Sequence, residues 1–151
     1  CIPIDPNYLS FKTRQIGKPV RFVELAQEIN NTMPTYIVGR VLEMMNKLGK
    51  PMNNSSILLF GVAYKKDISD TRESPAIEVV TQLREQGFDV TCVEPNLESH
   101  EEFTLIGLKE AINNFNFFVL LVDHKEFQVL DSSNEIMNKT VLDFCGTLNS
   151  K

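Results

Sequence analysis

Two short segments of the 151-residue chain carry the side chains best suited to chemistry. The first is Cys1-Ile2-Pro3-Ile4-Asp5, in which a carboxylate follows a thiol by four residues. A thiol near the amino end of a helix can have a lowered pKa and act as a nucleophile. We expect Asp5-Pro6 to supply the N-cap and first residue of such a helix. A purely structural thiol is the alternative, because a cysteine with a nearby aspartate is common.

The second segment is a cluster of charges that directly follows an apolar run, Ile57–Val62. Within nine residues it contains Lys65, Lys66, Asp67, Asp70, Arg72 and Glu73. Ligands of open α/β sheets bind at the carboxyl ends of strands, and lysine and arginine suit phosphate groups. Ser74-Pro75 then predicts the N-cap and first residue of a helix, whose amino end also favours anions. A solvated loop of mixed charge explains the same residues equally well.

Other polar residues give weaker signals. Glu94 lies about where a dinucleotide-binding fold places a ribose-binding carboxylate, but Gly61 stands without the G-x-G-x-x-G pattern. A solvated strand end is therefore the favoured interpretation of Glu94. We expect a capping or packing role for His124, and buried packing for Cys92 and Cys145. With three cysteines and two histidines, widely spaced, neither a disulfide framework nor a metal site is predicted.

Composition restricts the possible partners. A net charge of −5 and a pI near 5.1 argue against a nucleic-acid or anionic-membrane surface. No apolar run approaches the length needed to cross a bilayer. The chain opens on a cysteine, without a signal-like segment, so we expect a cytoplasmic protein cut from a longer chain.

The elements that position these residues change in character near Pro51. Before it we expect a short helix from Pro6 to about Gln15 and a long helical pattern over Phe22–Leu48. Pro34 inside that pattern predicts a kink or a break into two helices. Residues 1–50 are thus predicted to form a helical connector.

Residues 51–151 alternate between strand and helix patterns. Strands are expected at Ile57–Val62, Phe88–Val93, Phe117–Val122 and Thr140–Phe144, and helices at Ala76–Gln86 and Leu108–Phe115. Such alternation predicts an α/β domain with a doubly wound, Rossmann-like parallel sheet.

Three motifs, in order, resemble the NAD-dependent nucleotide-sugar 6-dehydrogenase family over residues 1 to about 143. They are Cys1-Ile2-Pro3-Ile4-Asp5-Pro6, then Phe22-Val23-Glu24-Leu25-Ala26 with Met33-Pro34, and then Gly61-Val62-Ala63-Tyr64-Lys65-Lys66-Asp67 with Asp70-Thr71-Arg72-Glu73-Ser74-Pro75. Val93-Glu94-Pro95 stands where the family usually has Tyr-Asp-Pro.

The resemblance implies a reaction and a role for four residues. The family oxidises the C6 hydroxyl of a UDP-sugar to a carboxylate, with two hydride transfers to two NAD⁺. Cys1 matches the thiolate that captures the aldehyde as a thiohemiacetal, later oxidised to a thioester and hydrolysed, and Asp5 matches the acid that assists it. Lys65 matches a lysine that contacts the UDP-sugar, and Arg72 an arginine that contacts NAD.

The resemblance also implies partners. The family carries an N-terminal Rossmann domain upstream of the cysteine, so this chain is expected to be an inactive C-terminal fragment. The region Phe22–Leu48 is expected to form a homodimer interface, with core packing inside the chain as the alternative. The Cys-Ile-Pro-Ile-Asp-Pro motif looks most like bacterial UDP-N-acetylglucosamine dehydrogenases, which feed capsule synthesis. UDP-N-acetylmannosamine, UDP-glucose and a non-catalytic nucleotide-binding or dimerisation module are the alternatives.

Overall fold

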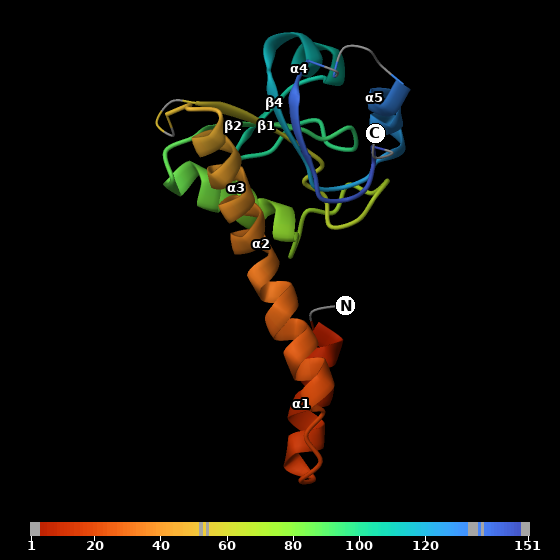
Figure 1. Ribbon diagram of the computed structural model, residues 1–151. Helices are drawn as coiled ribbons and strands as arrows, with labels where there is room; N and C mark the ends of the chain where they lie inside the picture. Colours follow the sequence, from red (N-terminus) through yellow and green to blue (C-terminus); the bar gives the residue numbers. More distant parts are fainter. Residues whose placement is uncertain (1–3, 52, 54, 133–135, 137, 149–151) are drawn as a thin grey trace.

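The chain forms a helical arm attached to an α/β domain (Figure 1). The computed structural model describes residues 4–51, 53, 55–132, 136 and 138–148. The arm consists of α1 (Ile4–Gln15) and α2 (Arg21–Lys47), which pack side by side at the end far from the domain. Arg14 of α1 and Glu24 of α2 are joined by a salt bridge of 2.8 Å.

The predicted N-cap of the first helix and the predicted break of the second helix at Pro34 are both wrong, whereas a kink at Pro34 stays a prediction. Helix α1 begins at Ile4, so Asp5 lies in its first turn and is not its N-cap. A carboxylate is favourable there because it faces the positive end of the helix dipole. Helix α2 runs through Pro34 without a break. Proline removes one backbone donor, but the helix continues because Val38 and Met45 beyond it are buried against the domain.

The domain is built on a five-stranded, all-parallel sheet, which confirms the predicted fold class. Its strands are β1 (Ser56–Phe60), β2 (Asp89–Val93), β3 (Thr104–Leu105), β4 (Phe117–Leu120) and β5 (Thr140–Asp143), in the order β3-β2-β1-β4-β5. The two-residue strand β3 was not predicted, because so short a segment has no periodicity to detect. With β1 at the centre, the order reverses there, and such switch points are where doubly wound sheets bind ligands.

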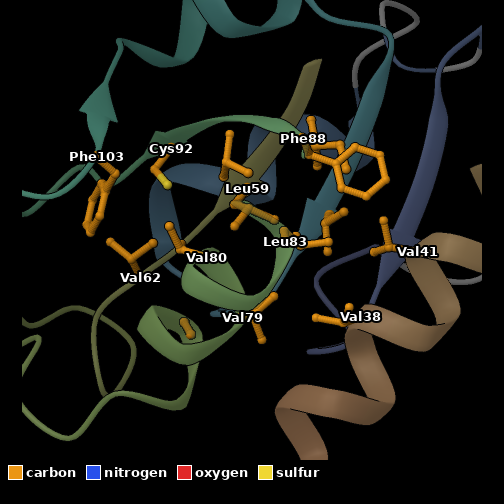
Figure 2. Close-up of a cluster of buried hydrophobic side chains, with 14 of the residues drawn as sticks. Val38, Val41, Leu59, Val62, Val79, Val80, Leu83, Phe88, Cys92 and Phe103 are labelled. Carbon is orange, nitrogen blue, oxygen red and sulfur yellow. The ribbon is translucent and has the colours of Figure 1, made fainter. Parts of the chain in front are cut away.

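Helices cover both faces of the sheet. They are α3 (Pro75–Glu85), α4 (Leu108–Asn114), the 3₁₀ helix η1 (Lys125–Gln128) and α5 (Val129–Ser132). Alternate residues of β1 point to opposite faces. Leu59 packs with Val80 of α3 and Val41 of α2 in one buried cluster (Figure 2), whereas Phe60 packs with Phe127 of η1 in another.

The attachment of α2 to α3 fixes the arm on the domain. The carboxyl half of α2 buries Val38, Val41 and Met45 against α3 and the sheet. Figure 2 shows Val38 and Val41 in this contact. The amino half extends beyond the domain with α1 (Figure 1). None of the described helices is both long and apolar enough to span a bilayer.

Candidate functional site

A groove of about 690 Å³ separates the arm from the carboxyl end of β1. One wall comes from Pro6 and Asn7 of α1 and from α2, and the other from the loop after β1 and the start of α3. The wall residues are Pro6, Asn7, Val23, Ala26, Gln27, Asn30, Asn31, Pro34, Tyr64, Thr71, Glu73, Ser74, Pro75, Ile77 and Glu78. The groove thus brings the residue that follows Asp5 opposite the immediate neighbours of Lys65 and Arg72.

Residues 61–73, which we call the charged loop, present the predicted cations to solvent. Lys65 is exposed, and its Nζ lies 5.7 Å from the centre of the Tyr64 ring. Arg72 donates from Nε and Nη2 to the two carboxylate oxygens of Asp70, at 2.9 and 2.8 Å. These hydrogen bonds lower the pKa of Asp70 to about 2. Arg72 is therefore held in one orientation by a fully ionised partner.

The loop leaves β1 through a glycine that has no room for a side chain. Gly61 has a φ of +83°, and a Cβ built on it would lie 2.5 Å from the Cβ of Val122. In a dinucleotide fold, glycines at this turn let a pyrophosphate approach the backbone. Here the protein itself fills the space beside Gly61. This turn therefore does not fit the dinucleotide pyrophosphate, in agreement with the missing glycine pattern.

The start of α3 follows its predicted capping. Ser74 is the N-cap and its Oγ accepts from the Ala76 N–H at 3.3 Å, while Pro75 occupies the first turn. The Ile77 N–H donates to the Ser74 carbonyl. Two donors at this helix end are thereby satisfied within the chain, so the cations of the loop remain the stronger feature for an anionic ligand.

Glu94 and His124 form a buried pair beside the charged loop, which corrects the prediction of a solvated strand end. Glu94 is only 4% exposed, and its Oε2 lies 3.0 Å from Nε2 of the fully buried His124. Burial alone raises the pKa of Glu94, but the hydrogen bonds from His124, Val62 and Asn96 outweigh it and hold this pKa below its ordinary value. The expected capping or packing role of His124 is consistent with this environment.

One group of described residues has the composition of a metal site. Ligand atoms of Asp67, His124 and Glu126 lie within 4.8 Å of one another. However, His124 Nδ1 accepts from the Asp67 N–H at 2.9 Å, and Asp67 Oδ1 accepts from the Lys125 N–H at 3.0 Å. The single lone pair of Nδ1 is used by the hydrogen bond from Asp67 and Nε2 donates to Glu94, so the imidazole has no nitrogen free to ligate a metal, although Glu126 Oε2 is buried without a hydrogen-bond partner. The group therefore supports no metal assignment.

The structure describes two of the three cysteines, Cys92 and Cys145. Cys92 is buried in β2, and burial raises the pKa of its thiol to about 12. Cys145 follows β5 and is only partly buried, which differs from the predicted buried packing, and desolvation raises the pKa of its thiol to about 11. Neither thiol is therefore a ready nucleophile at neutral pH. Cys1 lies outside the described residues. Its expected partner Asp5 is exposed on the first turn of α1, next to the groove.

The structure is a doubly wound α/β domain whose charged loop lies at the carboxyl end of the central strand, where such sheets bind ligands. Residues 58–150 match the UDP-glucose/GDP-mannose dehydrogenase family, UDP binding domain. The chain belongs to this family.

Several known proteins are similar to the whole chain. It is 32% identical over 156 residues to the UDP-N-acetyl-D-mannosamine dehydrogenase of Methanocaldococcus jannaschii, covering 99% of this chain and 34% of that protein. It is also 32% identical over 156 residues to the NDP-N-acetyl-D-galactosaminuronic acid dehydrogenase of Ralstonia solanacearum, covering 100% and 35%. The structure of a UDP-D-ManNAc dehydrogenase from Pyrococcus horikoshii superposes with a TM-score of 0.81 at 24% identity, covering 100% and 35%. The chain therefore spans about a third of the length of the curated relatives it matches.

Proposed function

We propose that this chain is the connector and UDP-binding part of an NAD-dependent UDP-sugar 6-dehydrogenase. The groove supports this proposal most directly. Its two walls carry segments that the motif resemblance assigns to one reaction, the start of α1 beside Asp5 and the charged loop with Lys65 and Arg72. An upstream domain of the same protein would supply the dinucleotide site that the turn at Gly61 lacks.

The residues of this chain would act on the sugar end of the substrate. Lys65 would contact the UDP-sugar, and an ammonium suits its diphosphate. The Cys1 thiolate would add to the C6 aldehyde to give a thiohemiacetal, and water would later release the acid from the thioester. Asp5 would orient that water and handle its proton. NAD⁺ would accept a hydride in each of the two oxidations, with Arg72 contacting it across the groove.

The substrate proposed is a UDP-N-acetylhexosamine. Motifs in the sequence favour UDP-N-acetylglucosamine, whereas the M. jannaschii and R. solanacearum relatives are named for N-acetylmannosamine and N-acetylgalactosaminuronic acid. All three names share an N-acetylated amino sugar. The relatives' names make UDP-N-acetylmannosamine the first sugar to test, with UDP-N-acetylglucosamine and UDP-glucose beside it.

A homodimer is proposed through the arm. Phe22, Leu25, Ile29, Met33 and Tyr36 recur at steps of three and four along α2, and all are exposed, with Phe22 at 88%. Packing within the described part of the chain does not cover them, which is against the core-packing alternative for these residues. Contiguous apolar surface of this kind is typical of an interface.

The test of the reaction is the yield of NADH from the complete enzyme, measured by absorbance with each sugar separately. About two NADH per molecule of one preferred UDP-sugar would support the four-electron oxidation. Cys1→Ser should abolish that yield while UDP binding persists. Tight UDP binding without NADH from any sugar would instead favour a non-catalytic nucleotide-binding module.

A further inference from the structure

The beginning of the charged loop is held by the carboxylate of Glu94. Its Oε2 accepts from the backbone N–H groups of Val62 and Ala63, at 2.9 and 3.0 Å. Its Oε1 accepts from the backbone and side-chain nitrogens of Asn96, at 3.2 and 3.4 Å. A carboxylate that accepts several N–H donors in a buried setting fixes the backbone that donates them.

Through His124, the same carboxylate is also linked to Asp67, which ends the turn formed by residues 62–67. Nε2 of the ring lies 3.0 Å from Glu94 Oε2, and Nδ1 lies 2.9 Å from the Asp67 backbone nitrogen. Because a backbone N–H only donates, Nδ1 is the acceptor, and the ring proton sits on Nε2 and points at Glu94. Asp67 has a φ of +60°, a conformation that needs support from its surroundings.

Only Tyr64, Lys65 and Lys66 lie between the two anchored ends of the turn. The backbone of Tyr64 is further tied by its N–H to the Asp70 carbonyl at 2.7 Å. So short a span between fixed ends has few conformations available. Glu94 and His124 therefore determine the position of the Lys65 backbone, and with it how far the Lys65 ammonium can reach.

We propose that Glu94 and His124 are positioning residues, a buried pair that holds residues 62–67 so that Lys65 meets the diphosphate of the nucleotide. This inference rests on the proposed UDP-binding function of the charged loop. Neither side chain would touch the ligand. A buried ion pair or hydrogen-bonded pair is weak support for stability by itself, so a role in specifying one loop conformation is the testable alternative.

Two substitutions of His124 separate its two contacts. In His124→Asn the amide oxygen occupies the position of Nδ1 and keeps an acceptor for the Asp67 N–H. In His124→Gln the amide nitrogen occupies the position of Nε2 and keeps the donor to Glu94, but the support of Asp67 is lost. We expect His124→Gln to weaken UDP binding roughly five- to thirtyfold, and His124→Asn, which loses the bond to Glu94 but keeps the direct support of Asp67, to weaken it less.

The measurement is UDP affinity of the complete enzyme by calorimetry, combined with a double-mutant cycle on Lys65. If His124 acts through Lys65, the variant carrying both Lys65→Ala and His124→Gln should bind UDP no more weakly than Lys65→Ala alone. Val90→Ala at the opposite end of β2 is the control, because it removes buried volume without touching the loop. It should lower the melting temperature and leave UDP affinity unchanged.

The outcomes are distinct. A wild type that does not bind UDP, or a Lys65→Ala variant with unchanged affinity, would overturn the proposed function of the loop. Three results would overturn the positioning role alone, provided that UDP binding depends on Lys65. They are an unchanged UDP affinity in His124→Gln, additive losses of binding free energy in the double-mutant cycle, and an equal loss of affinity in Val90→Ala. If His124→Gln does not fold, Asn96→Ala replaces it, because the Asn96 amide contacts both Glu94 and His124 and is partly exposed. A several-fold, non-additive loss in that variant is then expected, and wild-type affinity would overturn the proposal.

Discussion

Arg72 donates two side-chain hydrogen bonds to the Asp70 carboxylate, yet 87% of the Arg72 side chain remains exposed. The guanidinium has five N–H donors, so the pair orients Arg72 and leaves donors for a ligand. The sequence predicted both residues as charges of one loop. Their pairing explains why the arginine is presented in a defined direction on a surface loop.

Arg72→Ala should raise the KM for NAD⁺ of the complete enzyme about tenfold, because a charge-assisted contact to the cofactor is lost. UDP affinity should be unchanged, since Lys65 carries that contact in the proposal. Initial-rate kinetics at varied NAD⁺ would measure the effect. Lys109→Ala, which removes an exposed cation from α4, is the matched control and should leave both quantities unchanged. An unaltered KM for NAD⁺ in Arg72→Ala would contradict the assignment.

Gly61→Ala should destabilise the domain by about 2–4 kcal/mol, since the new Cβ would meet Val122 and the φ of +83° is unfavourable for alanine. Gly39→Ala, in the middle of α2, should instead raise the free energy of unfolding. Nothing lies within 4 Å of its Cβ position, and alanine favours a helix by about 0.5–1 kcal/mol. Urea unfolding of both variants would measure the two effects. Equal stabilities would show that the turn can relax around the added methyl group.

The sequence predicted those features whose causes are local. Ser74-Pro75 is a cap followed by a first-turn proline, and both signals lie within two residues of the helix they start. Strands β1 and β4 were found because each contains a continuous apolar run. Glu94 was misjudged because its burial depends on His124, thirty residues away. A single sequence contains no signal for a pair that only the packing of β2 beside the loop after β4 brings together.

Acid should weaken the fold partly through Glu94. Its native pKa is depressed, so its contribution to stability is complete above the unfolded value of about 4.3 and is lost as pH falls through the lower native value. The pKa of Asp143 is depressed too, because hydrogen bonds from Leu148, Cys145 and Gly146 outweigh its burial, and it adds to the same acid loss. Through these two carboxylates, the free energy of unfolding should decline below about pH 4.5.

Glu94→Gln measures how much of the loss of stability in acid comes from Glu94. The glutamine amide nitrogen would face N–H groups, which are donors and cannot accept a hydrogen bond from it. The free energy of unfolding at pH 7 should therefore fall by about 1–3 kcal/mol. The decline of stability below about pH 4.5 should become shallower than in the wild type. Chemical unfolding at a series of pH values measures both effects, and Glu85→Gln at the exposed end of α3 is the control. An unchanged acid slope would mean that other carboxylates carry the effect.

The exposed apolar stripe on α2 should decide the oligomeric state. Ile29 is 55% exposed at the centre of the stripe, between Leu25 and Met33. Ile29→Glu places a charge where a partner helix would remove water, so the proposed dimer should dissociate by about two orders of magnitude more readily. Sedimentation velocity over a concentration series would measure the shift. Thr35→Glu adds the same charge at an exposed position of α2 outside the stripe, and it should leave the association unchanged. A monomeric wild type would contradict the proposed homodimer.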